Sequence, residues 1–220
     1  MAGPWLQSLE LVAQPDLLIS SPDDTLAAIA PMLNEVAGID LESGADVRRL
    51  KAAIASDRHE GVGGTRVVIG SQPDRVLEEL SEFSIVEVAA APSTSRLVSQ
   101  RRPAAVVGLH GFSETAGTPD TSFSVQMIDD WGIDDVMATA LDLASREGPA
   151  LAVLFDLAVL DPAFDQIRTI PGGLDLRRLF RAARASGRRP EVSAAGFVKA
   201  GSEVNLVHAV LSFCAGLAGR

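Results

Sequence analysis

The sequence predicts an α/β fold, with helices covering both faces of a mainly parallel sheet in a three-layer α/β/α arrangement. Short apolar runs alternate with amphipathic stretches along the chain, which is the pattern of strands joined by helical crossovers. The run at 150–155 lacks polar alternation, as expected for a strand buried on both faces. The 220 residues, of which 47% are hydrophobic, are enough for a single domain over 1–220.

Each predicted element rests on a local pattern. Strands are expected at 65–70, 84–89, 104–109, 123–128, 150–155 and 191–198, and helices at 74–82, 132–146, 174–186 and 204–217. The strand at 65–70 is the run TRVVIG between glycines and a proline. The helix at 132–146 has apolar residues on one stripe at helical spacing. This alternation predicts right-handed crossovers between parallel strands.

The first 60 residues are harder to place. We expect a strand at 17–20, a helix from Pro22 to Val36 capped by Ser21, and a second helix at 46–56. Loops are expected at 61–64 and 113–122, where small and polar residues gather.

Composition limits which partners and which cellular compartment are expected for the protein. The formal net charge of −10 argues against nucleic acid as a ligand. No apolar run is long enough to span a membrane, and no signal peptide is evident. A single cysteine, Cys214, cannot form an internal disulfide. We therefore expect a cytoplasmic protein that binds neither nucleic acid nor membrane.

Basic side chains are concentrated in one segment, which contains Arg177, Arg178, Arg181, Arg184, Arg188 and Arg189. Most of them are expected on the outer face of the helix at 174–186 and in the turn that follows. A solvated helix face is the favoured interpretation, and an anion site is the alternative.

The segment 150–173, ALAVLFDLAVLDPAFDQIRTIPGG, carries a family resemblance. It is similar to the signature segment of the ureohydrolases, the family of arginase, agmatinase and formimidoylglutamase. There a strand ends in Asp-x-Asp-x-x-Asp-Pro, and a Pro-x-Gly-Gly-type turn precedes the next helix. Asp156, Asp161 and Pro162 match this pattern, whereas Ala158 replaces the second aspartate. The resemblance implies an arginase-like fold, truncated because the chain is shorter than typical members.

The resemblance also implies that a metal site has been lost. In the family, carboxylates and histidines at the strand ends hold two manganese ions. Here Gln72 follows Ser71 in the place of a ligand histidine, and Ala89, Ala91 and Ser93 replace the three ligands of Asp-Ala-His-x-Asp. Lys199 occupies the position of a glutamate that meets the cationic substrate. The resemblance therefore implies no catalytic residue, no metal ligand set and no cofactor. It leaves a relic cleft of Ser71, Gln72, Ser93, Asp156, Asp161 and Lys199.

The remaining charged residues of this cleft need partners. A carboxylate at the end of a central strand is costly to bury alone. We hypothesise that the Lys199 ammonium pairs with Asp156 in place of the lost metal charge. The alternative, of equal weight, is that Asp156 caps a loop and Lys199 points to solvent. Asp161 is expected to bond backbone amides in its turn and so to preserve the fold.

Three functions remain open. The favoured one is a non-catalytic ureohydrolase-fold protein that acts as a scaffold or regulatory subunit. Family resemblance implies an oligomer, made either with itself or with an active paralogue. The second is a manganese-dependent hydrolase of amidine or guanidine substrates whose ligands are completed elsewhere, for instance across a subunit interface. The third is a protein that binds a small anion, such as a carboxylate, in the vacated cleft near Lys199.

Overall fold

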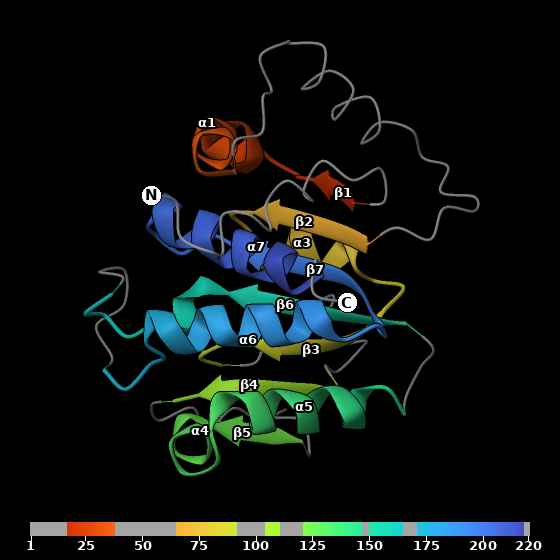
Figure 1. The fold of residues 1–220 in the computed structure, drawn as a ribbon, viewed down its shortest axis with the longest axis vertical. Helices are drawn as coiled ribbons and strands as arrows, with labels where there is room; N and C mark the ends of the chain where they lie inside the picture. Colours follow the sequence, from red (N-terminus) through yellow and green to blue (C-terminus); the bar gives the residue numbers. More distant parts are fainter. Residues whose placement is uncertain are drawn as a thin grey trace.

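The computed structural model describes residues 17–37, 65–91, 104–110, 121–146, 150–164 and 171–217. They form one seven-stranded parallel sheet (Figure 1). In spatial order its strands are β1 (Leu17–Ser20), β2 (Thr65–Gly70), β7 (Val192–Val198), β6 (Leu151–Asp156), β3 (Ser84–Val88), β4 (Ala105–Leu109) and β5 (Ser122–Ser124). The predicted α/β class with a parallel sheet is confirmed.

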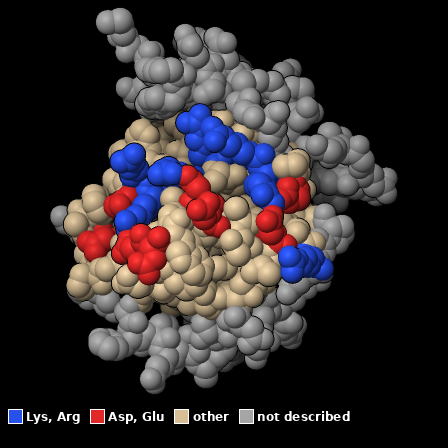
Figure 2. All heavy atoms as spheres, turned by 60° about the horizontal axis from the view of Figure 1, so that its bottom comes forward, with Lys and Arg blue, Asp and Glu red and all other residues tan. Residues whose placement is uncertain are grey.

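Helices pack on both faces of this sheet. They are α1 (Thr25–Ala37), α3 (Pro73–Glu79), α4 (Val125–Trp131), α5 (Ile133–Ala144), α6 (Leu176–Arg188) and α7 (Glu203–Leu217). In Figure 1, α5, α6 and α7 lie in front of the sheet, and α3 covers β2 and β7 from the other side. Figure 2 brings the lower part of Figure 1 forward and shows basic and acidic side chains close together on this surface. None of the described helices is long and apolar enough to cross a membrane.

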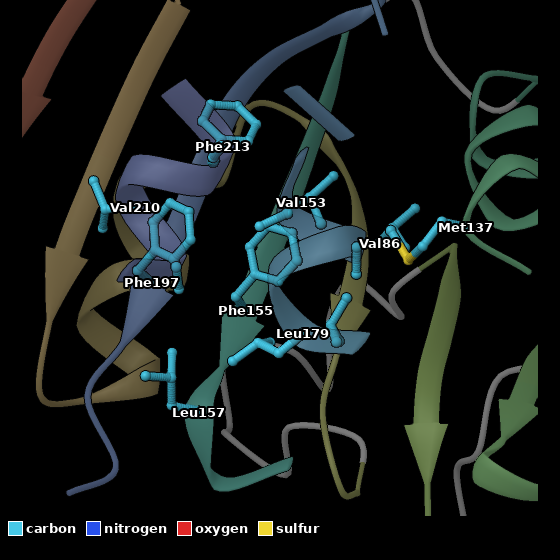
Figure 3. Packing of buried hydrophobic residues seen from close by; sticks show 14 of the residues in the cluster. Val86, Met137, Val153, Phe155, Leu157, Leu179, Phe197, Val210 and Phe213 are labelled. Carbon is cyan, nitrogen blue, oxygen red and sulfur yellow. The ribbon is translucent and has the colours of Figure 1, made fainter. Parts of the chain in front are cut away.

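Two apolar clusters, one on each face of the sheet, hold the layers together. On the face covered by α1, α5, α6 and α7, the rings of Phe155 and Phe197 stack with centroids 5.1 Å apart. Phe213 of α7 meets Phe197 edge-on at 6.0 Å (Figure 3). On the other face, α3 packs on a smaller cluster that includes Leu154 and Val198. Burial on both faces explains why the strands read as continuous apolar runs.

Helices α6 and α7 cross at two glycines, which lets their backbones approach closely. A Cβ on Gly216 would lie 2.3 Å from the carbonyl oxygen of Arg184, and one on Gly187 would lie 2.2 Å from that of Phe213. Neither space admits a methyl group, so the approach of these two helices depends on glycine at both positions.

The structure corrects several predicted boundaries. The strand expected at 123–128 ends at Ser124, and α4 begins at Val125. The Ser124 hydroxyl oxygen accepts a hydrogen bond from Met127 N at 3.3 Å, so this serine caps a helix instead of continuing the strand. The first helix begins at Thr25, not Pro22, and Ser21 is not its cap. Asp175 caps α6, which starts two residues later than predicted and extends to Arg188.

Some predictions lie outside the described residues. They are the helix at 46–56, the loop at 61–64, most of the loop at 113–122, and Ser93 of the expected cleft.

Candidate functional site at the carboxyl ends of the strands

All seven strands are parallel, so their carboxyl ends lie at one edge of the sheet, where α/β proteins bind ligands. Three neighbouring strands, β2, β7 and β6, bring the described residues of the predicted cleft to this edge. Ser71 and Gln72 follow β2, Lys199 follows β7, and Asp156 ends β6. Asp161 follows after the short 3-10 turn Leu157–Val159.

Ser71 forms a compact cluster with Asp23, a residue that the sequence did not single out as a site residue. The Ser71 backbone N–H and hydroxyl both donate to Asp23 Oδ2, each at 2.8 Å. Thr25 N donates to Asp23 Oδ1 at 2.9 Å, where α1 begins. Asp23 therefore ties the loop after β1 to the loop after β2. Gln72, which immediately precedes α3, is exposed and its side chain makes no capping bond.

The surroundings of Asp23 stabilise its charged form. Partial burial raises the pKa of this carboxyl, but hydrogen bonds from Thr25 and Ser71 outweigh burial and lower the pKa well below its ordinary value of 3.8. A carboxylate that accepts several N–H and O–H bonds keeps its negative charge in this way. The cluster is thus a fixed anion that joins two loops, and its acceptor positions are turned towards protein donors.

The end of β3 offers no donor side chain. Ala89 and Ala90 are each only 3% exposed, and Ala91 is half-buried. The backbone of Ala89 and Ala90 is hydrogen-bonded to β4 and the residue that follows it. Ala89 N donates to Val107 O at 2.9 Å, and His110 N donates to Ala90 O at 3.3 Å. A methyl group cannot coordinate an ion, so this strand end is closed and apolar.

Asp156 caps the turn that follows β6. Ala158 N donates to Asp156 Oδ1 at 2.9 Å, and the carboxylate is half-buried. This is the loop-capping role that we considered as the alternative to an ion pair with Lys199.

The Lys199 ammonium is paired with a different carboxylate from the one we hypothesised. Its Nζ lies 2.6 Å from Oε1 of Glu203, the first residue of α7. The reason is the pleat of the sheet. Asp156 is in register with Val198, and successive strand residues point to opposite faces, so Lys199 is directed to the face that α7 covers. The alternative, in which Lys199 points freely to solvent, is also wrong, because its ammonium is paired with Glu203.

Asp161 closes the loop between β6 and α6. It accepts hydrogen bonds from Ala163 N at 2.9 Å and Gly172 N at 2.8 Å, as predicted. Bonds from Ala163 and Gly172 hold the pKa of this carboxyl below its ordinary value. A Cβ on Gly173 would lie 2.5 Å from both Asp161 N and Val159 O, so the turn requires glycine there. The Asp-Pro and Pro-Gly-Gly parts of the motif therefore maintain the loop.

The donors that the described residues bring to this edge do not make up a ligand set for a pair of manganese ions. Within the described ranges, no three His, Cys, Asp or Glu side chains form a group that could hold a metal ion. Asp156 and Asp161 each bind backbone amides, the end of β3 carries only alanines, and Lys199 adds a cation that Glu203 compensates. Mn²⁺ prefers carboxylate, imidazole and water ligands, and a two-metal site needs several of them at once.

Comparison with known proteins identifies the fold. No protein-family model matches the chain, and no curated protein matches it. Several solved structures match it. Formimidoylglutamase from Bacillus subtilis matches with a TM-score of 0.60 and 14% identity over 70% of this chain and 61% of that one. Arginase from Bacillus subtilis matches with a TM-score of 0.62 and 13% identity, over 93% of this chain and 98% of that one.

Formiminoglutamase from Trypanosoma cruzi, solved with Mn²⁺, matches with a TM-score of 0.65 and 15% identity over 100% of both chains. The chain thus has the arginase-like α/β fold of the ureohydrolases. The chain spans less than two thirds of the Bacillus subtilis formimidoylglutamase but all of the trypanosomal enzyme, so the truncation expected from the sequence depends on the relative chosen. At this level of identity the likeness establishes the fold and leaves the activity open.

Proposed function

We propose that this chain is a non-catalytic protein with the ureohydrolase fold, which acts by binding as an oligomeric scaffold or regulatory subunit. The observation that carries the proposal is the end of β3, where Ala89, Ala90 and Ala91 stand together. Two of these alanines are buried, and a methyl group carries no donor atom, so none of the three can coordinate a metal ion.

The neighbouring strand ends support the same proposal. Two-metal hydrolysis requires several anionic ligands, which hold both ions and keep a bridging water as hydroxide. Asp156 has Ala158 two residues after it, and Oδ1 of Asp156 already accepts a backbone hydrogen bond. Lys199, which follows the neighbouring strand β7, adds a cation that is already paired with Glu203. This pair also weakens the small-anion alternative, because an incoming carboxylate would compete with Glu203 for the ammonium.

What the chain retains is consistent with a binding role. The Asp161 turn, the glycines where α6 crosses α7 and the phenylalanine cluster all maintain the fold. Such features stabilise a surface for partners without contributing to hydrolysis. The expected partners are copies of this chain or an active paralogue.

The metal content and activity of the purified protein test the catalytic part. After incubation with Mn²⁺ and removal of free metal, we expect substoichiometric manganese and no release of urea or ammonia from guanidine or amidine compounds. The Ala158→Asp variant, which restores a second carboxylate beside Asp156, is a matched comparison and is expected to retain more manganese than the wild type. Stoichiometric manganese together with hydrolysis by the wild type would overturn the proposal.

The scaffold part is tested by mass. Light scattering after size-exclusion chromatography should give a multiple of the monomer mass, or a complex when the chain is co-expressed with an active ureohydrolase from the same source. A monomer in both experiments would contradict a scaffold or subunit role.

A further inference from the structure

Helix α6 presents a stripe of arginines to solvent. Arg177, Arg181, Arg184 and Arg188 are separated by four, three and four residues, which places them on one side of the helix. All four are exposed. The opposite side of α6 is buried and lined by Leu179, Ala182, Ala183, Ser186 and Gly187. The stripe is therefore the outward face of a helix whose inward face is fully packed.

An acidic helix already lies along one flank of α6. Arg181 pairs with Asp134 at the start of α5, and eight residues further along the chain in each case Arg189, which caps the end of α6, pairs with Asp142 of α5. The equal spacing shows that α5 and α6 run parallel with their charges in register. The contrast of basic and acidic side chains on this surface is visible in Figure 2. Arg178 is likewise paired with an acidic residue of a neighbouring helix, since its guanidinium lies 2.7 Å from Asp129 Oδ1 of α4.

The outer arginines have no such neighbour within the described part of the chain. Arg177, Arg184 and Arg188 make no ion pair with any described residue, although the whole chain carries a net charge of −10. Over the seven and four residues that separate them, the helix rises about 10 Å and about 6 Å. They form a row of cations that is longer than a single small anion can bridge.

We propose that this row, Arg177, Arg184 and Arg188, is a docking surface for an acidic α-helix of a partner protein. The proposal rests on the binding role proposed above and specifies its partner. The partner helix would carry carboxylates seven and four residues apart and would lie along α6 as α5 does. Guanidinium groups suit this contact, because each can bind a carboxylate through two parallel N–H bonds.

Charge distribution favours a short acidic segment over a long polyanion. A duplex or an anionic membrane extends beyond the stripe and would meet the surplus of acidic side chains elsewhere on the protein. A single helix interacts mainly within the Debye length, which is about 8 Å at physiological ionic strength. It therefore responds to the local arginines and not to the net charge.

Fluorescence anisotropy with a labelled helical peptide tests the proposal. The probe carries glutamates at the spacing of the three arginines, and a matched peptide carries glutamine at the same positions. We expect the glutamate peptide to bind, with an affinity that falls as salt rises, and the glutamine peptide to bind at least about tenfold more weakly. The triple variant R177E/R184E/R188E should lose at least about tenfold in affinity for the glutamate peptide.

Matched controls separate a local effect from net charge. Arg184→Glu and Arg75→Glu change the net charge equally, but Arg75 lies on α3, across the sheet from α6. Only Arg184→Glu should weaken binding, while circular dichroism melts confirm that both variants fold. Equal effects of the two variants, or no binding of the glutamate peptide at low salt, would overturn the proposal. So would tighter binding of an oligonucleotide or of phosphatidylserine vesicles. Self-association that the triple variant abolishes would instead assign the surface to a second copy of this chain.

Discussion

Replacement of Asp23 by alanine is expected to destabilise the folded protein by about 3 kcal/mol at neutral pH. The carboxylate accepts three short hydrogen bonds, from Thr25 N at 2.9 Å and from Ser71 N and Oγ at 2.8 Å, and a longer one from Ser21 Oγ at 3.3 Å. Hydrogen bonds to a buried charged group contribute about 1.5–3 kcal/mol each, and because this site is partly exposed each of the three short bonds is taken as about 1 kcal/mol. Ser71→Ala removes only the hydroxyl and should cost about 1 kcal/mol.

The effect of Asp23→Ala should depend on pH in a defined direction. The pKa of Asp23 in the folded protein lies below its ordinary value of 3.8, which the unfolded chain adopts. A depressed carboxyl pKa contributes stability that is fully present above 3.8 and is lost as the pH falls below it. The difference in stability between wild type and Asp23→Ala should therefore be constant near neutrality and shrink towards about pH 2.

Urea denaturation followed by circular dichroism measures both effects. Glu78→Ala, which removes an exposed carboxylate from the neighbouring helix α3, serves as the control and should change stability by less than about 0.5 kcal/mol. The double variant Asp23→Ala/Ser71→Ala should cost less than the sum of the two single variants, because the pair is in direct contact. A loss at Asp23 no larger than at Glu78, or a difference that persists unchanged at low pH, would refute the role assigned to this cluster.

Three further predictions concern the packing of the helices on the sheet. Gly216→Ala should cost about 1–3 kcal/mol in urea denaturation, because the new methyl group would lie 2.3 Å from the Arg184 carbonyl oxygen; an unchanged midpoint would show that the helices can move apart. Phe197→Ala should cost about 3–5 kcal/mol, whereas Val204→Ala, at a side chain that is 53% exposed, should cost less than about 0.5 kcal/mol. Burial raises the pKa of the Cys214 thiol to about 12, so a thiol reagent at mildly alkaline pH should modify it only as fast as the chain opens; rapid modification of the native protein would contradict this.

Local patterns were enough to predict most of the sheet. Strands buried on both faces are mostly apolar, and the runs at 65–70, 84–89, 104–109, 150–155 and 191–198 differ from the observed strands by at most about a residue at each end. The apolar stripe at 132–146 likewise predicted α5. The strand predicted at 123–128 failed because the capping bond of Ser124 turns an equally apolar run into α4, and periodicity over so few residues cannot separate the two.

Part of the candidate site could likewise be predicted from the sequence, and part could not. Residue identity alone determined that the end of β3 has no donor side chain, and the Asp-Pro and Pro-Gly-Gly motif predicted the Asp161 turn, because these depend on residues close together in the chain. Asp23 could not have been placed beside Ser71, since the two are 48 residues apart and meet only when β1 and β2 pair.

The pairing of Lys199 was decided by tertiary structure for a related reason. Adjacent strands suggested a contact with Asp156, but the register between β6 and β7 sets which face each side chain occupies, and that register puts Lys199 within reach of Glu203. The sequence by itself thus determined the fold class and the absence of ligand atoms at one strand end. Only the tertiary structure decided which charges meet, because a shift of one residue in a strand moves a side chain to the other side of the sheet.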